Sequence, residues 1–237
     1  MSELRLSFGN VAETYRRVRP PYSRPLLDRA QEALKLDAGA HVLDLGAGTG
    51  RLTEELGRRF AEVVAVEPDE RMRALHGNAL DGRAEEIPLQ AAAVDAVFVG
   101  EAFHWFDPAD AIGELARVLR PRGGLAIFWT HWWETEPPLP DAALELLREP
   151  WERFAAQRKP RWDDAFLDSP FEPLRYERFD EAITVDPDNL LELYSTTSSL
   201  AALEPNERTN LFAQVRKLLA GPYLLPLRHE LTWTRLA

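Results

Sequence analysis

The turn at residues 46–50 is the part of the chain that most constrains its fold. An apolar run at residues 41–45 enters this turn, and three alternating glycines stand within it. Residues 51–60 follow with apolar side chains at every fourth position, the spacing of an amphipathic helix. Glycine adopts unusual backbone angles and lets a ligand approach the main chain. Strand, glycine turn and helix predict the first unit of a doubly wound sheet, whose ligands bind at the carboxyl ends of the strands.

Strands and helices continue to alternate after this unit. Further strands are predicted at residues 61–66, 79–84, 94–100, 125–130, 177–185 and 227–235. Asp69, Asp107 and Asp186 each stand where a helix N-cap is needed, and Pro follows both Asp107 and Asp186 at the first helical position. The alternation predicts an α/β fold: a doubly wound, mostly parallel seven-stranded sheet with helices on both faces.

The chain of 237 residues is predicted to form a single domain, 1–237, which is long enough to bury a large core. Residues 1–36 are expected to form N-terminal cap helices. Residues 131–170 interrupt the alternation with several Trp and Pro residues, and we interpret them as a helical insertion or lid after the fifth strand. The helix from about Asp141 is expected to kink or restart at Pro150.

Charge and composition exclude several classes of function. Asp and Glu number 39 against 28 Lys and Arg, a net charge of −11, whereas nucleic-acid binders need a basic surface to replace phosphate counterions. The absence of Cys excludes thiolate metal sites and Cys nucleophiles. The chain shows no signal-like start and no apolar run near the ~18 residues that span a bilayer. A cytoplasmic protein with no nucleic-acid or membrane partner is expected, and its oligomeric state is left open.

The spacing of the glycines restricts the class of ligand that the turn can bind. A dinucleotide fingerprint places its third glycine where this chain has Arg51, and Gly50 comes one residue early. A phosphate-binding P-loop is excluded because no Gly-Lys-Ser/Thr follows. These departures argue against a ligand held by its pyrophosphate. A turn that is rich in glycine only for tight packing is the alternative.

Two carboxylates favour a ligand over simple packing. Glu67 ends the strand at 61–66, where it can accept hydrogen bonds from both hydroxyls of a ribose. Asp44 precedes the turn and could favour an ammonium or a sulfonium. A nucleoside without a pyrophosphate, carrying such a cation, is what S-adenosylmethionine (SAM) offers.

At this point the chain resembles the class I SAM-dependent methyltransferases. The resemblance is carried by residues 44–50, 66–69, 82–88, 95–106 and 117–124. Arg19-Pro20-Pro21-Tyr22 and the segment 102–106 are most similar to the small-molecule group of trans-aconitate methyltransferase-like (methyltransferase type 11) proteins. Many relatives carry an acidic residue at the position of Arg83, so adenine recognition here would rest on the backbone around Ala84 and Glu85.

The resemblance implies a set of site residues and no metal. The cofactor-binding residues would be Tyr15, Arg19, Asp44, Gly46, Ala47, Gly48, Gly50, Glu67, Pro68, Ala84, Glu85 and Glu101. The substrate-binding residues would be His104, Trp105, Trp129 and His131. His104 is the candidate catalytic residue, as a general base or as a hydrogen-bond partner of the acceptor, with a purely structural role in its loop as the alternative.

The implied function is methyl transfer from SAM to an oxygen or nitrogen of a small molecule, a carboxylate among the options. A catalytically silent SAM-binding protein is the alternative, and an NAD-dependent oxidoreductase is disfavoured by Arg51. Amino-methyltransferases of DNA and RNA often carry a Pro-Pro-aromatic segment after the fourth strand, which residues 100–106 lack. Cytosine-C5 enzymes need a Cys nucleophile, which is absent here.

Overall fold

The computed structural model describes residues 11–132, 139–155 and 162–237, which form two compact units. The first unit takes the chain up to Pro20, then 131–158 and 180–227; the second takes 21–130, 159–179 and 228–237. Asn10 precedes the expected first helix and is a residue type that favours the N-cap, but it lies outside the described residues. Among the residues that are described, no helix is long and apolar enough to cross a membrane.

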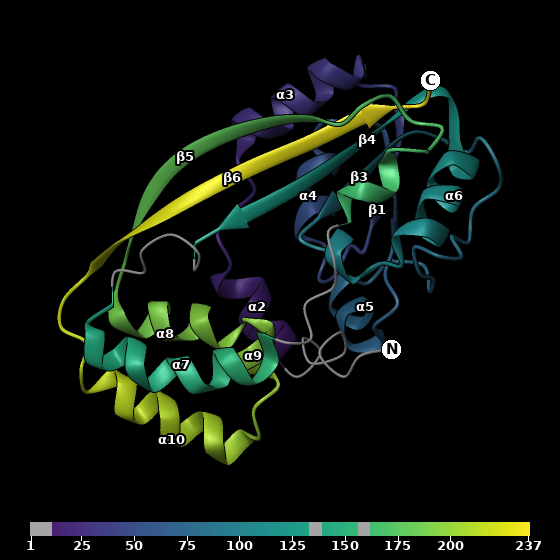
Figure 1. Cartoon of the computed structure of the whole chain (residues 1–237). Coiled ribbons are helices and arrows are strands. Elements are labelled where there is room, and N and C mark those ends of the chain that lie inside the picture. The colour runs from purple at the N-terminus through teal and green to yellow at the C-terminus, as the bar shows by residue number, and fades with distance from the viewer. Residues whose placement is uncertain (1–10, 133–138, 156–161) are drawn as a thin grey trace. The chain divides into compact units, whose positions relative to one another are not determined.

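The sheet has the order β2-β1-β3-β4-β6-β5, and the second unit contains its strands apart from residues 131, 180–185 and 223–227. The strands are β1 (His41–Leu45), β2 (Glu62–Val66), β3 (Val94–Gly100), β4 (Leu119–His131), β5 (Arg175–Val185) and β6 (Tyr223–Arg235). The strand pairs β1–β2, β1–β3 and β3–β4 are parallel, whereas β6 runs opposite to β4 (Figure 1). The sheet is therefore mixed, with its parallel strands at the end that carries the glycine turn.

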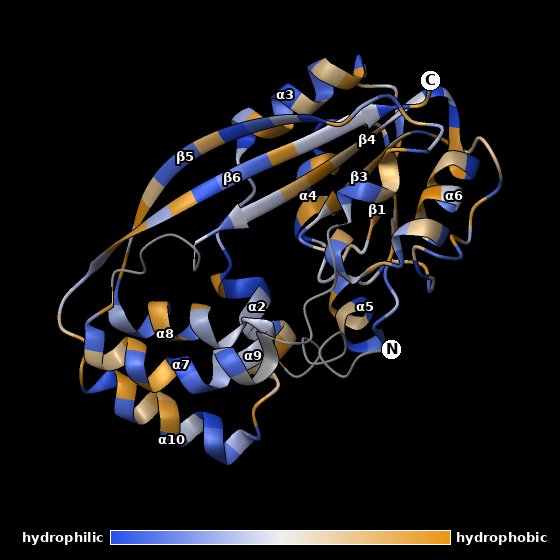
Figure 2. Cartoon of the chain, in the orientation of Figure 1, coloured by the Kyte–Doolittle hydropathy of each residue, from blue (hydrophilic) through white to orange (hydrophobic). Residues whose placement is uncertain are grey.

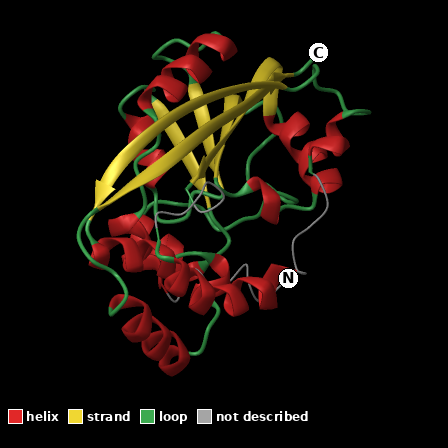
Figure 3. Ribbon diagram, turned by 60° about the vertical axis from the view of Figure 1, so that its left-hand side comes forward, coloured by secondary structure: helices red, strands yellow, loops and turns green. Residues whose placement is uncertain are grey.

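Helices cover the two faces of the sheet (Figure 3). Alternate side chains of the parallel strands are buried against them. One face packs on α3 (Arg24–Leu34) and α4 (Arg51–Gly57) through Val42, Ala96, Phe98, Ala126 and Phe128. The opposite face packs on α6 (Pro108–Val118) through Leu43, Val97, Val99, Leu125 and Ile127. By contrast β5, at the edge of the sheet, is mostly exposed and largely hydrophilic (Figure 2).

Three predicted helix starts are confirmed by their caps. The carboxylate of Asp69 accepts from the backbone N–H groups of Arg71 and Met72 and begins α5 (Glu70–His76). In the same way Asp107 begins α6, and Asp186 begins α8 (Pro187–Ser195). A cap of this kind satisfies backbone donors that the helix itself leaves open, which is why so local a signal locates the start.

The sheet has six strands among the described residues rather than the predicted seven. At residues 79–84 only Leu80 pairs with β2, in a single bridge to Val66. The backbone of Gly82 packs closely on Pro88, since a side chain at Gly82 would lie 2.6 Å from Cδ of Pro88. The chain turns there, with a bridge between Arg83 and Glu86, instead of extending beside β2.

Strand β4 starts earlier than the sequence predicts. Leu119 pairs with Val94, and the next pair joins Ala96 to Gly124, so residues 120–123 bulge out of the ladder. Arg122 has a φ of +64° within this bulge. The predicted turn before residue 125 is thus a bulge inside a longer strand.

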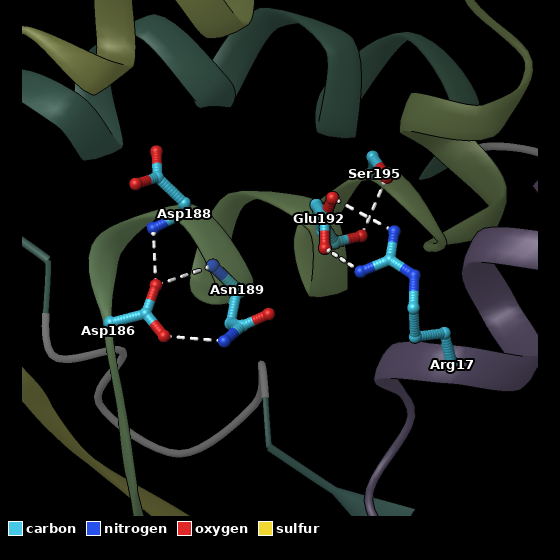
Figure 4. A network of polar contacts seen from close by, with 6 residues as sticks. All are labelled: Arg17, Asp186, Asp188, Asn189, Glu192 and Ser195. Carbon is cyan, nitrogen blue, oxygen red and sulfur yellow. Dashed lines mark hydrogen bonds and ion pairs between the residues drawn. The ribbon is translucent and has the colours of Figure 1, made fainter.

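The first unit is helical. It contains α2 (Ala12–Val18), α7 (Asp141–Ala155), α8, α9 (Ser198–Ala201) and α10 (Pro205–Arg216) around a core that includes Trp132 and Tyr194. Helix α7 runs through Pro150 without restarting. Arg17 of α2 forms two hydrogen bonds, of 2.5 and 2.9 Å, with the carboxylate of Glu192 on α8 (Figure 4).

The Tyr194 hydroxyl has no hydrogen-bond partner among the described residues, although the side chain is fully buried. Burial also raises the pKa of this hydroxyl. Replacing Tyr194 by Phe removes an unsatisfied polar group and should raise the free energy of unfolding by about 1 kcal/mol in urea denaturation. The matched control is Tyr223→Phe, which should lower it, because the Tyr223 hydroxyl accepts from the Ala220 N–H. A destabilised Tyr194→Phe variant would contradict this prediction.

Candidate functional site

Backbone hydrogen bonds hold the glycine turn against the end of β2. The N–H groups of Gly46 and Ala47 donate to the carbonyl of Val66 over 2.8 and 3.0 Å, and that of Gly50 donates to Ala47 over 3.0 Å. Gly46, Gly48 and Gly50 have φ values of +73°, +56° and +88°, a region that residues with side chains rarely adopt. The three glycines are therefore required by the turn itself.

The space around the three glycines differs. A side chain at Gly46 would lie 2.7 Å from Cβ of Ala102, and one at Gly50 would lie 2.9 Å from Cδ2 of His76. A Cβ at Gly48 would meet nothing within 4 Å. The middle of the turn is thus open, while both of its ends are packed against neighbouring segments.

The predicted ribose-binding residue Glu67 lies against this open glycine. Its carboxylate accepts from the N–H of Gly48 over 2.9 Å and from that of Asp69 over 2.8 Å. Burial raises the pKa of the Glu67 carboxyl, opposed by these two hydrogen bonds. The structure therefore brings Glu67 and the glycine turn together, as their spacing of about twenty residues predicts.

Asp44 is buried at the end of β1. Its Oδ2 accepts from the hydroxyl of Thr53 on α4 over 2.5 Å, while Oδ1 is buried with no partner among the described residues. The hydroxyl of Thr49, within the turn, is likewise buried and unpartnered in the described part of the chain. Desolvation raises the pKa of Asp44 to about 7, helped by the nearby charge of Glu67 and opposed by Thr53. Such groups are costly to bury without a partner, which is typical of a ligand site.

Three more residues of the predicted cofactor set lie beyond the end of β2. The carbonyl of Pro68 accepts from the Arg73 guanidinium over 2.7 Å. Ala84 is buried in the core, and Glu85 accepts from the N–H of Asp107 over 2.8 Å. Among the residues described, no group of three or more acidic or histidine side chains is arranged to hold a metal ion.

Glu101 ties the ends of β3 and β4 together. Its carboxylate accepts from the N–H of Thr130, and its own N–H donates to the carbonyl of Phe128. It has a φ of +58°, which is strained for a residue with a side chain. This strain is placed where the chain leaves β3 for the segment that carries His104.

An aromatic cluster follows the ends of β3 and β4. The ring of His104, in the short helix η2 (Phe103–Trp105), has its centroid 4.5 Å from that of Trp105 and 5.2 Å from that of Trp129. Trp162, which precedes η3 (Asp163–Phe166), adds a ring 6.2 Å from Trp129 and 4.9 Å from Phe103. His104, Trp105 and Trp129, three of the predicted substrate-binding residues, therefore lie together.

The remaining predicted residues, Tyr15, Arg19 and His131, belong to the first unit. There the Arg19 guanidinium lies 4.6 Å from the centroid of Tyr15 and 5.4 Å from that of Trp132. It also donates to the hydroxyl and the carbonyl of Thr196, over 2.9 and 2.7 Å. Their roles toward a cofactor or an acceptor stay predictions.

Sequence reasoning missed three residues of this site: Thr53, His76 and Trp162. Thr53 lies three residues after Gly50 in the helix that follows the turn, and this spacing could have pointed to Asp44. His76 reaches Thr53 over 2.9 Å from α5, a contact that depends on how two helices pack. Trp162 lies in the region interpreted as a lid, and no local pattern assigns it to the cluster around Trp129.

Comparisons with known proteins agree with this geometry. A family model described as "Methyltransferase domain" matches residues 43–127. An uncharacterised methyltransferase of Mycobacterium tuberculosis (strain ATCC 25618 / H37Rv) is 38% identical over 224 residues, which cover 92% of this chain and 87% of that protein. This chain belongs to the class I methyltransferases. The methyl donor of that family is S-adenosylmethionine, and it is the cofactor of this chain.

Solved structures show the same fold at lower identity. The structure of a candidate type II methyltransferase from Anaeromyxobacter dehalogenans has a TM-score of 0.61 at 22% identity, over 92% of this chain and 97% of that one. A geranyl diphosphate C-methyltransferase from Streptomyces coelicolor A3(2), solved with S-adenosyl-L-homocysteine (SAH), has a TM-score of 0.51 at 15% identity, over 90% and 79% of the two chains. The class I methyltransferase chain thus has a Rossmann-like fold.

The raised pKa of Asp44 predicts a pH dependence of stability. The pKa of Asp44 rises from 3.8 to about 7 on folding, so the folded state favours the protonated carboxyl. Its contribution to the free energy of unfolding is complete below pH 3.8 and is lost as the pH rises to about 7. Ionisation of Asp44 should therefore lower the free energy of unfolding of wild type by up to about 4 kcal/mol between pH 4 and 8, at about 1.4 kcal/mol per pKa unit. Asp44→Asn, which cannot ionise at this position, should not show this fall.

The measurement is urea denaturation of wild type and Asp44→Asn across this range, with Asp28→Asn at an exposed carboxylate as the control. The free energy of unfolding of wild type should fall relative to that of Asp44→Asn as the pH rises. A difference that stays constant from pH 4 to 8 would show that Asp44 ionises normally in the folded protein.

Proposed function

We propose that this methyltransferase transfers a methyl group from SAM to an oxygen or nitrogen of a small molecule, with the cofactor held at the turn 46–50. One observation carries this assignment: two buried carboxylates, Asp44 and Glu67, flank a glycine turn that is open only at Gly48. A carboxylate buried beside a second one is stabilised by a cationic, hydroxyl-rich ligand, and SAM has both properties.

The residues fit the parts of SAM as follows. Glu67, at the tip of β2, accepts hydrogen bonds from the ribose hydroxyls. Its carboxylate also accepts a hydrogen bond from the Gly48 N–H. Asp44 faces the cationic end of the ligand with its unpartnered Oδ1. Ala84 and Glu85 line the adenine, and Glu101 lies toward the methionine end.

SAM supplies a methyl group that is already activated for displacement, so the chain mainly has to position the acceptor and exclude water. His104 lies where β3 ends, and it accepts a proton from, or hydrogen-bonds, the acceptor oxygen or nitrogen. The rings of Trp105 and Trp129, each in contact with His104, form walls for the acceptor. Trp162 extends the same wall and joins the proposed acceptor site.

A small acceptor suits the charge of the molecule. The net charge of −11 opposes binding to nucleic acid, whose phosphates need a basic surface. Aromatic rings, those of Phe103, Trp105, Trp129 and Trp162, gather around His104 among the described residues beyond β3 and β4. Contacts with rings are the interactions by which a compact, partly apolar acceptor is bound.

Cofactor binding gives the first test. Glu67→Ala should weaken the binding of SAH at least tenfold in titration calorimetry, because the ribose loses a charged acceptor. The matched control is Glu62→Ala, which removes an exposed carboxylate at the other end of β2 and should leave the affinity unchanged. Equal affinity of Glu67→Ala and wild type would remove Glu67 from the ribose site.

Methyl transfer gives the second test. The protein is incubated with methyl-labelled SAM and a pool of small carboxylates, phenols and amines, and labelled products are separated. We expect at least one labelled product, with kcat lowered about 10²-fold by His104→Ala if His104 moves a proton. SAH binding without transfer to any acceptor class would favour a silent cofactor-binding protein, and an unchanged pH profile of His104→Ala would leave His104 a structural role.

A further inference from the structure

A chain of hydrogen bonds joins the buried carboxylate at the glycine turn to a histidine on another helix. The Thr53 hydroxyl on α4 lies 2.5 Å from Oδ2 of Asp44 and 2.9 Å from Nε2 of His76, near the end of α5. Asp44 is fully buried, whereas His76 is partly exposed. The three side chains therefore connect the interior of the site to the surface.

The direction of donation in this chain is set by the backbone. The N–H of Asn78 donates to Nδ1 of His76 over 3.2 Å, so Nδ1 is an acceptor and carries no proton. In the neutral ring the proton then lies on Nε2, which donates to the Thr53 oxygen. A hydroxyl has one proton, and the Thr53 proton is accordingly directed to Asp44.

We propose that His76 is a positioning residue for the cofactor: through Thr53 it holds a hydrogen-bond donor on Asp44 and so keeps that carboxylate ready for the cationic end of SAM. This inference rests on the proposed function, because it takes Asp44 as the cofactor's partner. It assigns to His76 and Thr53 a part in setting the pH range over which the cofactor binds.

The charges around Asp44 support this role. Glu67, at the tip of β2, opposes ionisation of Asp44, and Thr53 favours it. Arg73 on α5 is directed to the carbonyls of Glu67 and Pro68. On the β3 side the register partner of Asp44 is the uncharged Phe98. Two donors of Thr53 counteract the burial of Asp44, its backbone N–H and, as the larger effect, its hydroxyl, and His76 acts on the hydroxyl.

The same histidine also packs on the turn. A side chain at Gly50 would lie 2.9 Å from Cδ2 of His76, so the ring covers this end of the turn. A replacement for His76 has to preserve this packing if the hydrogen bond alone is to be tested. Leu fills a similar volume without a donor, whereas the amide of Gln can donate from near the position of Nε2.

The first experiment follows the carboxyl carbon of Asp44 by ¹³C NMR in the ligand-free protein, with Asp44→Asn to assign the resonance. His76→Leu should raise the titration midpoint of Asp44 by about half to one pH unit, because the Thr53 hydroxyl is no longer held as a donor to the ionised carboxylate. Thr53→Val should raise it at least as much. His76→Gln should recover at least half of the shift. His41→Leu, at the far end of β1, is the control and should leave the midpoint unchanged.

The second experiment measures SAH binding by calorimetry from pH 5.5 to 9 with the same variants. His76→Leu should bind SAH about three- to tenfold more weakly at pH 6 and within twofold of wild type at pH 9, where Asp44 is ionised in both. His76→Gln should follow wild type. Equal weakening at every pH, or Gln behaving like Leu, would overturn the proposal, since a structural role or the histidine charge would then explain the loss.

The two measurements separate this inference from the proposed function. If the titration midpoint of Asp44 does not move in His76→Leu, the proposed action of His76 on Asp44 through Thr53 is overturned, whatever the result of the SAH titrations. A midpoint that moves without any change in the pH profile of SAH binding overturns the role in cofactor binding. Failure of the wild-type protein to bind SAH at any pH would instead overturn the proposed function and, with it, this use of His76.

Discussion

Two hydrogen bonds to one carbonyl, that of Val66, determine the geometry of the site. They join the first residues of the glycine turn to the last residue of β2, so β1 and β2 end at the same level. Glu67 follows Val66 directly and therefore reaches the Gly48 N–H. Without this tie the carboxylate of β2 and the turn after β1 would not meet, although each would still be present in the sequence.

The burial of two carboxylates in one place is unfavourable for folding. Desolvation raises the pKa of both Asp44 and Glu67. The charge of Glu67 also opposes ionisation of Asp44, and the charge of Asp69 opposes ionisation of Glu67. Hydrogen bonds from Gly48, Asp69 and Thr53 offset part of this cost. Buried carboxylates that lower the free energy of unfolding of the ligand-free protein are better explained by the binding of a cationic ligand than by a role in stability.

The elements with strong local signals were predictable from the sequence. Strands β1 and β3 begin and end where their apolar runs do, and Asp69, Asp107 and Asp186 cap the helices they precede. Such signals lie within a few residues of each other, so they need no knowledge of the fold. The pairing of Asp44 and Glu67 with the glycine turn was predictable for a related reason, because parallel neighbouring strands end at one edge of the sheet.

What could not be predicted depends on packing between distant segments. Only Leu80 of the predicted strand at 79–84 pairs with β2, and the chain then turns, with Gly82 packed against Pro88. Residues 120–123 bulge within β4, since the register moves between Val94 and Ala96. Trp162 and His76 join the site through contacts across long sequence separations, and neither residue type at its position carries a local pattern.

The strand order places the two chemically different halves of the proposed site side by side. The carboxylates lie at the ends of β1 and β2, and the aromatic cluster lies beyond β3 and β4, with β1 and β3 adjacent. Gly46 stands at their boundary, where a side chain would lie 2.7 Å from Cβ of Ala102 and 3.5 Å from the ring of Phe106. Any side chain at Gly46 would push the segment of His104 away from the turn. Methyl transfer requires donor and acceptor atoms at about 3 Å, so under the proposed function the missing side chain of Gly46 would allow the two halves to approach that closely.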